Sequence, residues 1–378
     1  MPKDIGRITP ADEYLIHQIA NTFDVTGQSD LGWTEKIWGT FGRKDGSLQC
    51  DLGIGKYPNR DVIDGFAGCA RGVEQWTVRA SRSLSSKPDS LDIGPLRYEI
   101  VEPLTAVRAV LEPNDAQPVS FDLVFTAHLP PFFEDRDHAV QGGRVVTDVV
   151  RWHQAGTVEG RIWVDGEEID VRPDEWFAFR DRSWGVRQFV GAPPPDVASS
   201  DRSTYMNNLH VQWSPLVLKR RDGSHYELQY YFRDAGSEQT HFSAHINEAD
   251  GTQIPVQRIE SRVHYARHNR GFLGGTVLAH LADGVRTFHV NPASDTGFRL
   301  GPALYFGWNG EYHGSWKGDG HLAGEYVADC EKEIDALANP IWQGRDRILE
   351  VREGDAHGYG VLEHMLIGDW HELIDDAN

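Results

Sequence analysis

The sequence predicts an all-β protein made of two antiparallel β-barrel domains, with one helix near the N-terminus. Three observations predict this: many short apolar–polar alternations, Asp-Gly pairs between them, and a Pro/Ser-rich stretch near the middle of the 378-residue chain. Alternation with a period of two is the signal of a strand, and this length exceeds the usual size of one domain. Long helical periodicity is scarce, so we expect helices in under about a fifth of the residues.

The N-terminal helix is expected over residues 10–23. Thr9-Pro10-Ala11-Asp12 supplies a capping hydroxyl, a proline at the first helical position and an acid in the first turn. Apolar residues then follow helical spacing on one face: Leu15, Ile16, Ile19, Ala20 and Phe23. A second, short helix is expected around residues 331–338, where Asn339-Pro340 ends it.

Strands are expected where aromatic and β-branched residues alternate with polar ones. The clearest stretches are residues 75–80, 97–101, 120–127, 160–164 and 226–232. Asp-Gly pairs are a strong hairpin signal, and four of them lie between such runs, beginning at Asp165, Asp222, Asp250 and Asp283. Hairpins in series give antiparallel meanders, and long meanders avoid exposed edges by closing into barrels.

The domain boundary is expected at the Pro/Ser-rich stretch that begins with Gly191-Ala-Pro-Pro-Pro, because this composition is typical of linkers. It divides the chain into a first barrel over residues 1–190, a linker over residues 191–204 and a second barrel over residues 205–378. Each half holds enough strands for one barrel.

Charge and cysteine content limit the partners and the compartment. Lys and Arg total 37 against 57 Asp and Glu, a net charge of −20, which disfavours nucleic acid and anionic membrane surfaces as partners. The first residues lack the apolar core of a signal peptide, and no stretch has the ~20 apolar residues of a membrane span. Three cysteines without metal spacing (Cys50, Cys69, Cys330) predict ordinary thiols and a cytoplasmic location. Whether the chain forms a homodimer is left open.

The most distinctive string runs from Trp176 to Arg187, Trp-Phe-Ala-Phe-Arg-Asp-Arg-Ser-Trp-Gly-Val-Arg. Strand alternation places Asp181 on the same face as two phenylalanines, pointing into a core or cavity. A carboxyl group there either pairs with an arginine or takes a raised pKa, and the second state suits a general acid. A structural Asp–Arg cluster that ties strands together is the alternative.

This string also resembles the Asp-x-x-Trp-Gly element of the AttH-like and carotenoid 1,2-hydratase-like proteins, whose relatives include hydroxyneurosporene synthase and tocopherol cyclases. Supporting stretches lie at residues 93–104 with 121–125, 154–160 and 357–364, so the resemblance covers about residues 30 to 370. It implies two lipocalin-like barrels packed together around an apolar ligand cavity, with the family's Asp at Asp181 and its Trp at Trp184.

Other site candidates come from histidines and aromatic residues. His153, beside Trp152, is a candidate proton shuttle, and a histidine with a satisfied hydrogen bond is the alternative. Glu363 and His364 are neighbours in a strand and should point to opposite faces. The remaining candidates are expected to bind the substrate or to set the ionisation of the acid: Tyr98, Trp152, Trp176, Arg180, Trp184 and Arg187.

No cofactor or metal is expected. The chain has 17 histidines but no HExxH and no Cys/His spacing of a zinc site. Its glycine pairs lack the Gly-x-Gly-x-x-Gly pattern and the β-α-β setting of a dinucleotide site. No Gly-x-Ser-x-Gly nucleophile elbow is present.

These observations favour a cofactor-independent lyase or isomerase of the hydratase or cyclase type. Its substrate would be a hydrophobic small molecule (isoprenoid-, steroid- or aromatic-like) held in a barrel cavity, and Asp181 and His153 would be the catalytic residues. With 12 tryptophans, the chain has enough large rings to line such a cavity as well as its cores. A non-catalytic lipid- or pigment-binding protein is the main alternative, and an interaction scaffold is a third.

Overall fold

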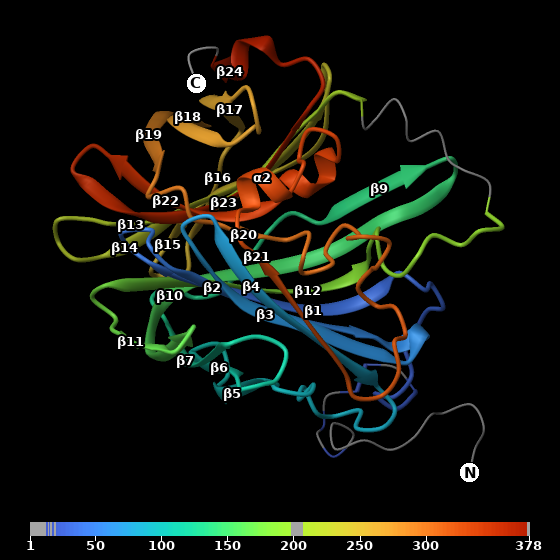
Figure 1. Ribbon diagram of the computed structural model, residues 1–378. Coiled ribbons are helices and arrows are strands. Elements are labelled where there is room, and N and C mark those ends of the chain that lie inside the picture. The colour runs from blue at the N-terminus through green and yellow to red at the C-terminus, as the bar shows by residue number, and fades with distance from the viewer. Residues whose placement is uncertain (1–12, 14, 16, 19, 198–206, 376–378) are drawn as a thin grey trace.

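The computed structural model describes residues 13, 15, 17–18, 20–197 and 207–375. In this part of the chain the fold is all-β, as predicted, with two curled sheets in which one lies across the other (Figure 1). Every pairing of neighbouring strands is antiparallel except that of β17 with the short C-terminal strand β24. Helical segments are short: η2 (Pro58–Arg60), α2 (Cys330–Glu333), η3 (Pro340–Gln343) and η4 (His371–Leu373).

The first sheet holds the strands of the N-terminal half and one strand from the other half. Its members are β1 (Trp33–Arg43), β2 (Gln49–Tyr57), β3 (Val62–Arg71), β4 (Glu74–Ser83), β5 (Leu96–Glu102), β6 (Ala106–Leu111), β7 (Val119–Ala127), β8 (Phe132–Phe133), β9 (Asp137–Gln141), β10 (Arg144–Val164), β11 (Glu167–Val171), β12 (Trp176–Val186) and β21 (His321–Val327). The last strand pairs with β4 and so crosses the domain boundary expected from sequence (Figure 1).

The second sheet is built from the C-terminal half alone. Its members are β13 (Leu209–Lys219), β14 (His225–Ala235), β15 (Glu238–Glu248), β16 (Gln253–Pro255), β17 (Arg258–Ala266), β18 (Phe272–Leu281), β19 (Gly284–Pro292), β20 (Phe298–Arg299), β22 (Arg345–Glu353), β23 (Ala356–Ile367) and β24 (Ile374–Asp375). Val256 and Gln257 connect its two ends, because their backbone N–H groups donate to Ala244 on β15 and to His280 on β18.

The predicted strands and hairpins are confirmed. All five alternating stretches lie in strands, and each of the four Asp-Gly pairs lies at the connection of two paired strands, although Gly284 is already the first residue of β19. Asp165 and Gly166 both have positive φ, 50° and 82°, as a two-residue type I′ turn requires. The local sequence therefore fixes both the turn and the register of the strands beside it.

Each sheet encloses its own apolar core, and a third core joins the sheets. Leu52, Val78, Phe121 and Ile162 belong to the core of the first sheet, which draws on strands from β1 to β12. Leu228, Phe288 and Leu349 belong to that of the second. Between the sheets, Trp38 and Phe179 pack with Trp213 and other large side chains, so both sheets present one face to each other.

The predicted N-terminal helix is wrong for the residues that the structure describes. Residues 10–12, 14, 16 and 19 lie outside them; of the rest of 10–23, only Glu13 is in a 3₁₀ conformation, and the others form bends, turns or irregular structure. The second helix is confirmed in part, since α2 covers only Cys330–Glu333 after the N-cap Asp329. No helix in the described ranges is long and apolar enough to span a membrane.

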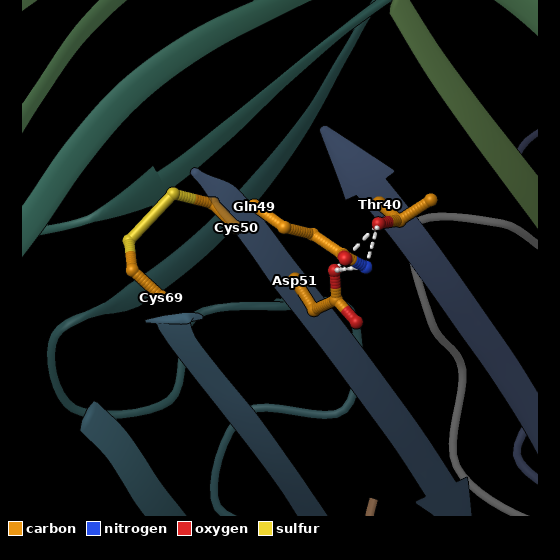
Figure 2. The surroundings of a disulfide bond; sticks show 5 residues. All are labelled: Thr40, Gln49, Cys50, Asp51 and Cys69. Carbon is orange, nitrogen blue, oxygen red and sulfur yellow. Dashed lines mark hydrogen bonds between the residues drawn. A yellow bond between two sulfur atoms is a disulfide. The ribbon is translucent and has the colours of Figure 1, made fainter. Parts of the chain in front are cut away.

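The prediction of three ordinary thiols is also wrong. Cys50 on β2 and Cys69 on β3 lie directly opposite each other and form a disulfide (Figure 2), and Cys330 is a free, buried thiol. The connection between the two strands contains η2, so the spacing of the cysteines in the sequence does not reveal how the strands pair. Disulfides are typical of oxidising compartments, so the cysteines no longer support a cytoplasmic location, which stays a prediction.

Candidate active site between the two sheets

A cavity of about 320 Å³ lies between the two sheets. Side chains of both sheets and of the segments that follow β12 and β20 line it. Its aromatic members are Trp38, Phe189, Trp213, Tyr231, Tyr305 and Phe306, and its charged members are Lys36, Asp137, Arg151, Asp181, Arg187, Arg233 and Glu363. A cavity that is mostly apolar with a few converging charged groups is the usual form of a small-molecule site. The sequence analysis led us to expect the cavity inside a barrel, but this cavity lies between the two sheets and outside both barrel cores.

Asp181 occupies the position predicted from strand alternation. It shares its face of β12 with Phe177 and Phe179, which pack in the core between the sheets, and it lines the cavity. Arg151 on β10 places Nε 3.4 Å from Asp181 Oδ2. Burial raises the pKa of Asp181 above its ordinary value, while Arg151 and Arg187 act against that rise. The residue therefore combines the two states that the sequence left as alternatives.

Glu363 on β23 is a second carboxyl group in the cavity lining. Burial raises the pKa of Glu363 to about 7, with a further rise from Asp181 and a lowering from a hydrogen bond to Asp346 and from Arg151. A carboxyl group with a pKa near neutrality exchanges protons readily at physiological pH. As predicted, its neighbour His364 points the other way, where its Nε2 lies 2.8 Å from the backbone oxygen of Arg270.

Behind Glu363, two more carboxyl groups extend the chain of acids into the protein. Glu363 and Asp51 both act on Asp346 and raise its pKa, and Asp346 accepts a hydrogen bond from Trp38 Nε1 at 3.0 Å. Asp51 is held by Thr40 and Gln49 (Figure 2). Burial raises the pKa of Asp51 to about 6 and the pKa of Asp346 well above its usual range. Neighbouring carboxyl groups can hydrogen-bond each other only if they share a proton, so we expect Asp51, Asp346 and Glu363 to share protons.

His153, the other predicted catalytic residue, is buried beside the cavity. Its Nε2 lies 2.8 Å from Glu227 Oε2 and its Nδ1 lies 3.6 Å from Glu134 Oε1. Burial alone would lower the pKa of His153, but the two glutamates raise it to about 10. Asn247 also donates to Glu227. The imidazole is therefore a charged member of an ion-pair network, which corrects the expectation of a proton shuttle near pH 7.

Arg151 connects that network to the cavity. It lies 2.9 Å from Glu134 and 3.4 Å from Asp181, and Trp213 Nε1 donates to Glu134 at 2.9 Å. Burial acts to raise the pKa of Glu134, but Arg151 and His153 favour its charged form and lower the pKa to about 2. Strand alternation alone would have placed Arg151 on the face of His153, so this residue could have been found from the sequence.

Of the eight predicted site residues, only Asp181 and Arg187 line the cavity. The expectation for the other substrate-binding candidates is corrected. Arg180 points into the first core, where it donates to Gln154 and Tyr98 and lies over the ring of Trp152 at 5.0 Å. It therefore does not set the ionisation of Asp181.

The two remaining tryptophans lie elsewhere on β12. Trp176 is buried in the first core, and Trp184 packs against Phe133 with ring centroids 6.3 Å apart. Neither ring belongs to the cavity lining, so the family resemblance at Trp184 marks a packing position in this structure.

Among the described residues, no three or more His, Cys, Asp or Glu side chains are grouped so as to hold a metal ion. The cavity lining itself supplies carboxyl, guanidinium, amine and phenol groups.

A family model matches residues 8–372. The chain belongs to DUF8625, a family of unknown function. No curated protein matches its sequence. The solved structures that resemble this DUF8625 chain include kievitone hydratase from Nectria haematococca, at 13% identity and a TM-score of 0.42 over 96% of this chain and 97% of that one. Another is CghA with Sch210972, at 10% identity and a TM-score of 0.49 over 90% of each chain.

Proposed function

We propose that the cavity between the sheets binds a small, largely apolar molecule and catalyses a proton-transfer reaction on it, as a lyase or isomerase without a cofactor. The observation that carries this proposal is a pair of carboxyl groups, Asp181 and Glu363, in the lining of one aromatic-walled cavity. Burial raises the pKa of both. Groups with perturbed pKa values in a cleft are typical of active sites.

The surroundings of the two carboxyl groups suggest different roles. Asp181 lies beside the guanidinium groups of Arg151 and Arg187, which favour its ionised form and suit it to be the base. Glu363 has a pKa of about 7 and a chain of acids behind it, which suits it to be the acid. Two titratable groups with divergent environments are a common basis for acid and base assignments.

In an elimination, Asp181 would remove a proton from the carbon next to a carbonyl, and the C–H electrons would form the enolate. Expulsion of the β-hydroxyl group then forms the C=C bond, and Glu363 gives its proton to that hydroxyl, which leaves as water. Hydration is the reverse. Arg151 and Arg187 would stabilise the negative oxygen of the enolate, since donors fixed in a water-poor site act strongly on developing charge.

A binding role without catalysis is the second candidate, and Arg187 favours it. Its Nη2 donates to Ser183 at 2.5 Å, but its Nε is buried without a hydrogen-bond partner among the described residues. A ligand carboxylate would satisfy this guanidinium group. The test of function must therefore separate binding from turnover.

Native mass spectrometry of the freshly purified protein, followed by solvent extraction, tests both. Val211→Phe narrows the cavity that Val211 lines, and Val124→Phe on β7 is the control outside it. We expect a molecule to co-purify with the wild-type protein and with Val124→Phe but not with Val211→Phe. We also expect the wild-type protein to convert this molecule in solution. Binding without conversion would leave the binding role, and equal ligand retention by both variants would contradict the site itself.

A further inference from the structure

Lys36 on β1 is a buried lysine that faces the cavity. Only 5% of its surface is exposed, and it lines both the main cavity and a small pocket of about 30 Å³ that continues from it past Tyr305 and His313. Its Nζ lies 4.1 Å from the centroid of the Tyr305 ring. The amine is therefore held against an aromatic ring, among the residues that line both the cavity and the small pocket.

No carboxylate of the described chain lies within 4.0 Å of this amine, although two are near enough to act on it. Asp64 and Asp181 favour its charged form, whereas Arg187 and Arg151 oppose it. Buried lysines are normally paired. With burial as the largest effect, the pKa of Lys36 falls to about 7, so a large share of the amine is neutral at physiological pH.

Other lysines of the chain lack this combination. Lys44 lies 5.8 Å from the ring of Tyr359 but donates to the backbone oxygens of residues 173 and 174, outside the cavity. Lys56 donates to the backbone of Pro88. Lys317 pairs with Glu311 at 2.8 Å. Lys36 alone among these four combines burial, the cavity lining and an unpaired amine.

We propose that Lys36 captures an aldehyde or ketone as a Schiff base, which makes a small apolar carbonyl compound the ligand class of this cavity. The inference rests on the proposed function only in placing the ligand in the same cavity. A desolvated lysine near other cations is the usual form of a Schiff-base lysine.

The reaction balances with groups already present. The lone pair of Nζ attacks the carbonyl carbon, and the C=O π electrons move to the oxygen. The nitrogen then loses a proton and the oxygen gains one, which gives a carbinolamine. The hydroxyl group then accepts a second proton and leaves as water while the C=N bond forms. Asp181, which acts on Lys36 from within the same cavity, is suited to carry these protons.

Reductive trapping tests the proposal. Wild-type protein is incubated at pH 7 with benzaldehyde and sodium cyanoborohydride, whose hydride reduces the imine carbon to a stable benzylamine. A cavity of roughly 150 Å³ holds benzene, so one of about 320 Å³ admits this probe. Peptide mass spectrometry then locates the benzyl groups and separates Lys36 from the α-amine, which also reacts at this pH.

We expect labelling of Lys36 at pH 7 to exceed that of the exposed Lys87 and Lys219 by roughly 10-fold or more, since lysines in water are protonated at this pH. The excess should shrink at pH 10, and Lys36→Arg should abolish it. Equal labelling of the three lysines at pH 7 would overturn the proposal, as would an unlabelled Lys36 at both pH values. Labelling that persists in Asp181→Asn while turnover is lost would show that capture and proton transfer are separate.

Discussion

His153 and Asp181 lie directly opposite each other on β10 and β12, yet the structure gives them different surroundings. His153 is enclosed by Glu134 and Glu227, and its charge is balanced on both ring nitrogens. Asp181 contacts Arg151 on one side and borders the cavity on the other. Of these two neighbouring buried groups, His153 is therefore paired with protein carboxylates, and Asp181 is accessible to a ligand in the cavity.

The difference arises from the second sheet. Glu227 on β14 and Asn247 on β15 complete the surroundings of His153, whereas Asp181 borders the cavity that side chains of the second sheet help to line. Buried charges that are fully paired hold the two sheets together, and a charge left partly unpaired beside a cavity is available for chemistry. Pairing, more than burial, separates the two roles.

The largest expected effect is on the paired side. Glu227→Gln removes one of the two charges that face the imidazolium of His153, and we expect the free energy of unfolding at pH 7 to fall by roughly 3–5 kcal/mol. Glu168→Gln breaks an exposed pair with Arg161 and should cost under about 1 kcal/mol. Urea unfolding of both variants checks this, and similar small losses in both would refute a structural His153.

The pH dependence of stability sharpens the same point. The pKa of His153 is raised in the folded protein to about 10, so its contribution is complete below pH ~6.5, its unfolded value, and is lost as the pH rises through about 10. The decline in stability over this window should be shallower in Glu227→Gln. A decline of equal slope in the variant and the wild type would show that a group other than His153 causes the loss of stability at high pH.

A smaller effect is expected from the acidic chain behind the cavity. Raised carboxyl pKa values stabilise the fold at low pH, and this contribution is lost as the pH rises from ~4 through about 6 for Asp51 and about 7 for Glu363. Asp346→Asn keeps an acceptor for Trp38 and removes one ionisable carboxyl group from the acidic chain. We expect it to stabilise the protein at pH 8 by roughly 1–3 kcal/mol relative to wild type and to flatten this slope.

Urea unfolding at pH 5 and pH 8 measures both quantities for Asp346→Asn. Destabilisation of equal size at the two pH values would show that the carboxyl groups do not share protons.

The smallest effect concerns Trp184, which the family resemblance placed in the site. Trp184→Leu removes a ring contact with Phe133 on the face of β12 that also carries Trp176 and Ala178 of the first core, so a stability loss of about 0.5–1.5 kcal/mol is expected. Ligand retention in native mass spectra should stay at the wild-type level. A variant that folds but loses the ligand would return Trp184 to the binding site.

Local features of the fold were predictable from sequence, and contacts between distant segments were not. The Asp-Gly turns and the alternation around Asp181 depend on a few neighbouring residues, so they were predicted correctly. The N-terminal segment has helical periodicity in its sequence, but the described residues beyond Glu13 show that the period alone does not make a helix. The partner of Cys50 depends on the register between β2 and β3, which no local pattern specifies.

The site followed the same division. Alternation separates Asp181 from Arg180, but it does not say which face meets the second sheet. Arg180, Tyr98 and Trp152 were therefore expected in the cavity, but Arg180 donates to Tyr98 of the first core and lies over the ring of the partly buried Trp152. Lys36 and Tyr305 enter the cavity from segments far apart in the chain, and the sequence around each looks like an ordinary strand or loop. The position of Glu363 opposite His364 was predictable, and its role at the end of an acidic chain was not.

Asp181→Asn tests the central claim most directly, once the ligand is known. Arg151 keeps its contact with Glu134, so the variant should melt near the wild-type temperature and bind the ligand with similar affinity. Turnover should fall by roughly 10²-fold or more, the usual scale for loss of a general acid or base. Asp122→Asn, on an exposed ion pair of β7, should keep full turnover. A folded Asp181→Asn protein that binds the ligand and turns it over at the wild-type rate would contradict the account.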